Sequence, residues 1–117
     1  MELHPERNLV RTRLYGQITT AHTAQAIVDL EGVLSQFRPG FTILTDLSGL
    51  ESMELDCAPH FSRIMDLCRD HGVGQVIRII PDPTKDIGLN ILSIIHYGTG
   101  VQVITCQTQA EGEKALK

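Results

Sequence analysis

The chain has 117 residues, of which 42% are hydrophobic, and 14 acidic side chains against 10 basic ones give it a net charge of −4. This length fits one domain with a substantial core. The basic residues are scattered and Trp is absent. Both features argue against a nucleic-acid partner, which needs clustered Lys and Arg or aromatic stacking platforms.

The apolar runs are all shorter than the roughly 20 residues that a membrane-spanning helix needs. The first residues lack the basic-then-apolar order of a signal peptide. We therefore expect a soluble, cytoplasmic protein. Three cysteines, Cys57, Cys68 and Cys106, follow no disulfide or metal-site spacing, so we expect them to be reduced and mostly buried.

The first third of the chain predicts a strand followed by a helix. Residues 8–15 alternate between apolar and charged side chains, which indicates a half-buried strand near a sheet edge that ends at Gly16. Residues 1–7 either fray or form a short edge strand. Thr19 or Thr20 is the expected N-cap of the helix. Apolar residues then recur at three- and four-residue intervals until a Pro-Gly pair stops the helix.

The middle third predicts a second strand and a second helix. Residues 41–47 are nearly all apolar or β-branched, as in a central strand covered on both faces. A polar turn at residues 46–49 is expected to end this strand. The helix is expected over about 56–71, with Gly72 after its last turn. If Asp56 is its N-cap, it cannot use the third helical position, because that residue is a proline without an N–H.

The last third continues the alternation. Residues 73–80 predict another buried strand, and the Asp82-Pro83 pair predicts the start of a third helix. This helix has apolar residues on more than one face, so one face would suit a partner, a ligand or a homodimer. Residues 101–106 predict a further strand, and a capping box at residues 108–111 opens a final helix.

Strands that alternate with helices predict one α/β domain over residues 1–117. Its sheet is expected to be mostly parallel, with four to five strands, right-handed crossovers and about four helices. The sequence contains no Gly-rich dinucleotide loop, no Walker motif and no nucleophile elbow. We therefore predict no cofactor, no metal site and no catalytic residue.

Two groups of residues invite a chemical interpretation. Cys57 and His60 lie three residues apart and would share a helix face, as a nucleophile with its base or half of a metal site would. Because spacing places no third group beside them, a buried thiol next to a surface imidazole is the favoured interpretation. Asp46, Asp56 and the glutamates between them could bind a cation or transfer protons. A solvated rim of turn-forming residues is favoured for this second group.

The motif Gly16-x-Ile18-Thr19 after the first strand, and the sequence Ile-Leu-Thr-Asp-Leu-Ser-Gly-Leu over residues 43–50, resemble the pattern of STAS domains. These domains are named for sulphate transporters and anti-sigma-factor antagonists. The order of elements fits this family over nearly the whole chain. The group that the chain resembles most consists of small bacterial STAS-like proteins related to the Sec14 lipid-binding fold. The resemblance implies a STAS-like fold and a regulatory, protein-binding module rather than an enzyme.

The phosphorylation motif of this family is altered in the chain. In bacterial anti-sigma-factor antagonists, the first Ser of an Asp-Ser-Ser-Gly motif is phosphorylated by a partner kinase, and the phosphate switches partner binding. Here Asp56 matches the Asp, but Cys57 stands at the phosphoacceptor position. The resemblance thus implies the fold and the location of the site without the usual switch. A cysteine at a helix N-terminus would instead offer a site of oxidation.

The first functional hypothesis is a non-enzymatic regulatory domain that binds another protein. The alternative, suggested by the Sec14-like relatives and the apolar third helix, is a carrier or sensor of a small apolar, lipid-like ligand. A small enzyme that uses Cys57, His60 and the acidic residues ranks third. The predicted partner- or ligand-binding residues are Asp46, Ser48, Gly49, Asp56, Cys57 and His60.

Overall fold

The computed structural model describes residues 1–82, 89–98 and 100–116, without the side chains of residues 90 and 91. Over these residues, the sheet has five strands in the order β1-β2-β3-β4-β5, which is also their order along the chain. The predicted mostly parallel sheet of four to five strands is confirmed, because only the first pair is antiparallel. The strands are β1 (Glu2–His4), β2 (Leu9–Ile18), β3 (Thr42–Met53), β4 (Gln75–Ile79) and β5 (Gln102–Cys106).

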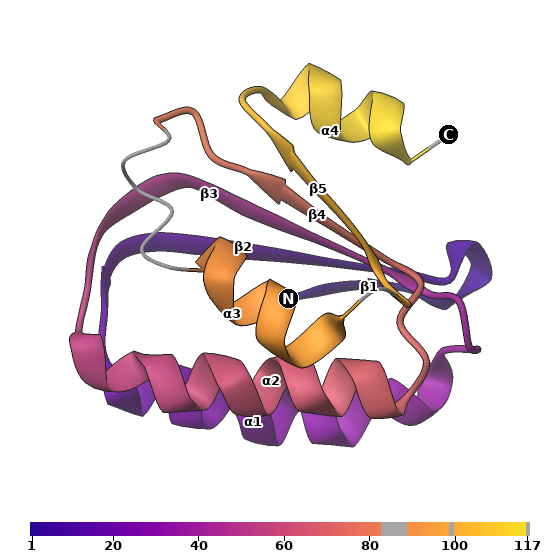
Figure 1. Cartoon of the computed structure of the whole chain (residues 1–117), viewed down its shortest axis with the longest axis horizontal. Coiled ribbons are helices and arrows are strands. Elements are labelled where there is room, and N and C mark those ends of the chain that lie inside the picture. The colour runs from indigo at the N-terminus through magenta and orange to yellow at the C-terminus, as the bar shows by residue number, and fades with distance from the viewer. Residues whose placement is uncertain (83–88, 99, 117) are drawn as a thin grey trace.

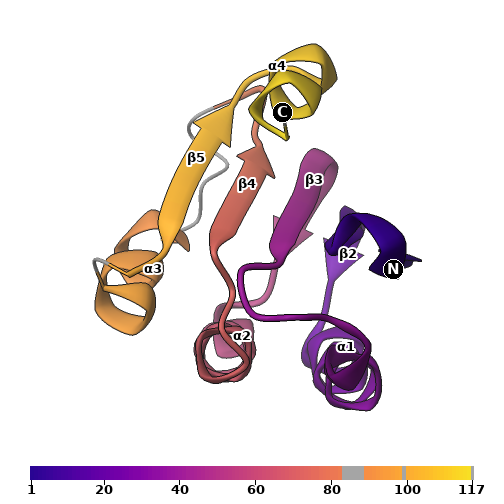
Figure 2. The same cartoon turned by 90° about the vertical axis from the view of Figure 1, so that its right-hand side faces the viewer.

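Four α-helices accompany the sheet in the described part of the chain. They are α1 (Thr20–Val33), α2 (Ala58–Asp70), α3 (Leu89–Tyr97) and α4 (Gln109–Ala115). The first three lie on one face of the sheet and α4 lies on the other (Figures 1 and 2). When each new strand is added at the same edge of the sheet and every crossover is right-handed, all the connecting helices lie on one face. Because α4 follows the last strand, this constraint does not apply to it.

Strand β3 is longer than the sequence predicted. Residues 46–49 do not end it, because pairing with β2 resumes at Gly49, opposite Tyr15. The residues just before Gly49 form a bulge, in which two residues of β3 face one residue of β2. The Asp46 carboxylate accepts hydrogen bonds from the amide (2.8 Å) and the hydroxyl (2.6 Å) of Ser48. The predicted turn is therefore wrong, since these polar residues serve a bulge inside a strand.

Three predicted helix ends are confirmed. Thr19 is the N-cap of α1: its hydroxyl accepts a bond from the amide of His22, and the His22 ring accepts one from the amide of Thr19. Gly72 follows α2 with a φ of 86°, in the left-handed region that favours glycine. At α4 the Thr108 hydroxyl accepts a bond from the amide of Glu111.

The start of α2 differs from the prediction. A 3₁₀ turn, η3 (Leu55–Cys57), precedes the helix, and Cys57 occupies the N-cap position without a side-chain cap bond. Asp56 lies inside that turn and is exposed, so the option that it caps the helix is wrong. The neighbouring Glu54 carboxylate instead accepts a bond of 2.9 Å from the amide of Thr20. This contact ties the first turn of α1 to the β3–α2 connection.

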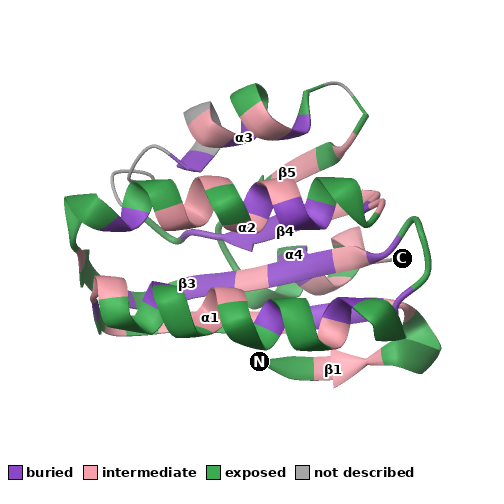
Figure 3. Ribbon diagram, turned by 90° about the horizontal axis from the view of Figure 1, so that it is seen from below, coloured by how far each residue is buried: buried purple, intermediate pink, exposed green. Residues whose placement is uncertain are grey.

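The main core lies between the sheet and the helices α1 and α2, and Figure 3 shows buried stretches along β3 and β4. A smaller cluster between the sheet and α4 consists of Leu9, Leu44, Ile77, Ile79 and Cys106. Both faces of β4 are buried, as predicted for a strand covered on two sides. All three cysteines are buried free thiols.

Helix α3 keeps apolar residues on its outer side. Ile94 and Ile95 are 69% and 67% exposed, in agreement with the predicted apolar surface on more than one face. The predicted start of this helix at Asp82-Pro83 reaches outside the described residues. Among the helices that the structure describes, none is long and apolar enough to cross a membrane.

Candidate functional site

A cavity of about 140 Å³ lies between the sheet and the helices α1, α2 and α3. Strands β2, β3 and β4 form its floor through Val10, Thr12, Leu14, Ile18, Ile43, Thr45, Val76 and Arg78. The three helices form its roof through His22, Thr23, Ala26, Leu30, Phe61, Ile64, Met65, Leu89 and Tyr97. Most of these side chains are apolar, with a small number of polar ones among them, as in sites for small molecules.

The polar groups of the floor belong to one row across the sheet. Thr12 of β2 pairs with Thr45 of β3, Thr45 pairs with Arg78 of β4, and Arg78 pairs with Thr105 of β5. Residues in register point to the same face of a sheet, which here is the face under α1 and α2. The Thr12 hydroxyl donates to the Thr45 hydroxyl at 3.0 Å. The floor therefore combines apolar rows with one polar line.

Arg78 is the charged member of this row. Its side chain is only 4% exposed, and its Nη2 donates a hydrogen bond to the Ser93 hydroxyl of α3. Ser93 in turn donates to the carbonyl of Leu89, one turn earlier in the same helix, at 2.9 Å. The guanidinium thus spans the space from the sheet to α3, and α3 fixes where its charge lies.

Tyr97 lies beside this guanidinium at the cavity wall and contacts Cys68 of α2. Burial raises the pKa of the Cys68 thiol to about 12, against the opposing effect of its hydrogen bond with Tyr97. Burial also raises the pKa of the Tyr97 hydroxyl, and the nearby Cys68 adds to this effect while the charge of Arg78 opposes it. Both groups are therefore neutral at physiological pH.

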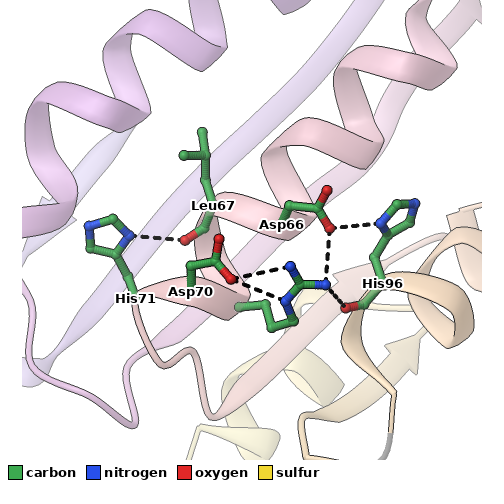
Figure 4. A network of polar contacts seen from close by, with 6 residues as sticks. Asp66, Leu67, Asp70, His71 and His96 are labelled. Carbon is green, nitrogen blue, oxygen red and sulfur yellow. Dashed lines mark hydrogen bonds and ion pairs between the residues drawn. The ribbon is translucent and has the colours of Figure 1, made fainter.

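A polar network fastens α3 to α2 beside the cavity (Figure 4). The Asp66 carboxylate of α2 lies 2.7 Å from Nδ1 of His96 and 3.2 Å from the guanidinium of Arg69. Arg69 also donates to the carbonyl of His96 at 3.1 Å and pairs with Asp70. Because His96 precedes Tyr97, this network positions the tyrosine at the cavity wall.

The cavity reaches the surface near the N-terminus. Met1 lines it and is 54% exposed, and the exposed His22 at the first turn of α1 lines it as well. The cavity is therefore partly open to solvent on this side.

Three of the residues predicted from sequence lie on the opposite face of the sheet from this cavity. Asp46 faces α4, where it accepts a hydrogen bond of 2.5 Å from the Gln109 amide and lies 3.8 Å from Arg13. Ser48 and Gly49 are exposed beside it. Burial alone would raise the pKa of Asp46, but the hydrogen bonds from Ser48 and Gln109 outweigh it and hold the pKa below its ordinary value.

The other three predicted residues lie around the start of α2 and contact different partners. His60 Nδ1 lies 2.5 Å from the hydroxyl of Thr23 in α1. Cys57 is 0% exposed, and its sulfur lies 4.0 Å from the carbonyl oxygen of Ile18. Asp56 is exposed. The structure thus divides the six residues between two faces, and their role in binding stays a prediction.

The burial of Cys57 sets a testable limit on the oxidation hypothesis. We expect its thiol to react with Ellman's reagent about a thousandfold more slowly in the native protein than in denaturant, because reaction requires an opening that costs about 4 kcal/mol. Mass spectrometry of labelled peptides would report each cysteine separately. A Leu55→Cys variant is the matched control, since Leu55 is 92% exposed and should react at once. Fast labelling of native Cys57 would contradict the expectation.

Arg78 and the polar row are the features that the sequence interpretation missed. A signal for Arg78 was present, because it is the one charged residue within the apolar run 76–80. A charge in a strand covered on both faces has to meet a polar group or a ligand. Thr12 and Thr45 gave no such signal, because threonine is ordinary in strands and only the register aligns them.

Comparison with known proteins identifies the fold. No family model matches the sequence, and no curated protein matches it. A solved structure does match: an uncharacterised protein from the DUF3478 family of Shewanella loihica PV-4, described as having a SpoIIAA-like fold. The two share 15% sequence identity, with a TM-score of 0.68 over 90% of this chain and 81% of the other. The chain therefore has the SpoIIAA-like, STAS-like fold that its motifs predicted.

Proposed function

We propose that this STAS-like domain binds a small apolar molecule in the cavity under α1 and α2, as a carrier or sensor. The observation that carries the proposal is the cavity itself, with about 140 Å³ of space among mostly apolar side chains in the main core. Protein interiors are otherwise packed as densely as organic crystals. The alternative hypothesis from the sequence thereby ranks above the protein-binding one.

The energetics of the cavity support this ranking. An empty cavity closed to water costs roughly 24 cal/mol per Å³, so a volume of about 140 Å³ corresponds to at most about 3 kcal/mol of lost stability. That is a large fraction of the roughly 5–15 kcal/mol by which a domain is stable. A ligand that binds only the folded state recovers this stability. Apolar cavities of about 150 Å³ take up benzene, so a six-membered ring fits the available volume.

Filling the cavity should abolish binding while it stabilises the protein. Ala26→Leu in α1 places a larger side chain in the cavity. We expect it to weaken toluene binding by at least about twentyfold and to raise the free energy of unfolding by about 1 kcal/mol. Titration of ¹³C-methyl-labelled protein with toluene measures the first effect, and urea unfolding measures the second.

Ala24→Leu is the matched control for this experiment. Ala24 lies two residues away on the same helix but is exposed. The same substitution there should leave toluene binding unchanged. Saturable toluene binding that survives Ala26→Leu unchanged would place the ligand elsewhere, and absence of binding to the wild-type protein would refute the proposal.

A second candidate function is the regulatory interaction domain, which one observation favours. Leu55 is 92% exposed in η3, directly before Asp56 and the start of α2. An apolar side chain so exposed at the position where STAS domains are switched would suit contact with a protein partner. A stoichiometric partner that is recovered with the wild-type protein and lost with Asp56→Lys would support this function. Equal recovery with both would count against it.

A further inference from the structure

We infer that the ligand of this cavity is a small aromatic or branched monocarboxylic acid whose carboxylate lies over Thr45 and Arg78. The inference rests on the proposed function and adds the chemical class of the ligand. It is carried by the polar row of the cavity floor, through which Thr45 and Arg78 present polar groups to an otherwise mostly apolar cavity.

Thr45 supplies the first donor. Its oxygen accepts the hydrogen bond from Thr12, so its own hydroxyl hydrogen is left to donate. Thr45 lines the cavity, and its hydroxyl stands in the polar row of the floor. An acceptor group of a ligand that lies over this row can take this hydrogen.

Arg78 supplies the charge. Its guanidinium borders the cavity directly beside Thr45 in the strand register, and it stays protonated in proteins. A hydrogen bond between two charged groups is about twice as strong as one between neutral groups, and more so away from water. Of the acceptor groups that can bond to Thr45, a carboxylate therefore gains the most binding free energy from the neighbouring Arg78. The contact between Arg78 and Ser93 keeps the guanidinium in place for it.

The rest of the cavity sets the size and polarity of the remaining part of the ligand. Val10, Ile43 and Val76 form an apolar row next to the polar one, and Leu30 and Met65 cover it. The volume of about 140 Å³ is below the roughly 300 Å³ at which pockets for drug-sized molecules begin. One ring or one branched chain of about six carbons fits here, whereas a long acyl chain does not.

Three probes with the same ring test the inference: benzoate, the isosteric benzamide and the smaller, apolar toluene. At pH 7 we expect benzoate to bind the wild-type protein at least about tenfold more tightly than benzamide, as measured by titration of methyl-labelled protein. Arg78→Met should reduce this ratio of affinities to about one. Arg78→Lys should still bind benzoate more tightly than benzamide, because it keeps the positive charge. Arg63→Met is the matched control, since Arg63 is exposed on α2 and its replacement should leave the ratio unchanged.

The outcomes separate this inference from the proposed function. If none of the three probes binds, the proposed function fails and the inference fails with it. If toluene and benzamide bind as tightly as benzoate, only the inference fails. The wild-type series decides this even where an Arg78 variant does not fold. Thr45→Val, which keeps the shape of the side chain, should weaken benzoate about fivefold and leave toluene unchanged, and an equal effect on both probes would overturn the role of Thr45.

Discussion

Replacing Phe41 by alanine should lower the free energy of unfolding by about 4 kcal/mol, more than any other substitution that we propose. Phe41 is fully buried directly before β3, and its ring centroid lies 6.0 Å from that of Phe37. The residue joins the end of the α1 segment to the central strand. Truncation would leave a hole that these rigid neighbours cannot fill. For a domain of this size, the midpoint of thermal unfolding should fall by roughly 15 °C.

Thermal and urea unfolding measured by circular dichroism check this prediction. Val28→Ala is the control, because Val28 is an apolar residue of α1 that is 62% exposed, and its truncation should change stability by less than about 0.5 kcal/mol. The backbone role of Phe41, whose carbonyl accepts bonds from the amides of Gly74 and Gln75, is kept in both variants. A loss below about 1 kcal/mol for Phe41→Ala would show that the core can collapse around the site.

Asp46→Ala should have the second-largest effect, and this effect should depend on pH. The variant loses the bonds from Ser48 and Gln109, and we expect a cost of about 2–3 kcal/mol at pH 7. The pKa of Asp46 is lower in the folded protein than its ordinary value of 3.8. Its ionised form therefore stabilises the fold fully above that value, and this contribution is lost as the pH falls through the lower, folded pKa.

Unfolding free energies of the wild type and of Asp46→Ala, measured as a function of pH, test the direction of this pH dependence. The difference in unfolding free energy should be constant from pH 7 to about pH 5 and should shrink below about pH 4. Asp56→Ala serves as the control, because Asp56 is exposed and its replacement should leave stability nearly unchanged at every pH. A difference for Asp46→Ala that grows on acidification would contradict the direction of the pKa shift.

The sequence predicted best those features that depend on a few neighbouring residues. Thr19 and Gly72 mark helix ends through the chemistry of single positions, a hydroxyl that caps and a glycine that adopts a positive φ. The alternation of strands and helices then predicted the layered sheet. The motif at residues 43–50 led to the right fold although the sequence identity to the structural relative is only 15%.

Features that depend on pairing between distant segments were predicted poorly. Asp46 and Ser48 have the composition of a turn, and only the partner strand β2 shows that they belong to a bulge within β3. The cavity is built by three strands and three helices, so no stretch of sequence carries its signature. Arg78 is the exception, because a charged residue within an apolar run that predicts a buried strand can be recognised from the sequence alone.

The identical order of strands in the sheet and in the chain has a consequence for how the protein folds. Each described strand from β2 onward pairs with the strand made just before it, so none has to be inserted between two strands that have already paired. Such near-neighbour pairing keeps the contact order below that of a parallel sheet in which later strands are inserted between earlier ones. The sheet can grow from its N-terminal edge while the ribosome is still adding about 5–20 residues per second. On this route β2 and β3 form the floor first, and docking of α3 completes the binding site only after β4 has been made.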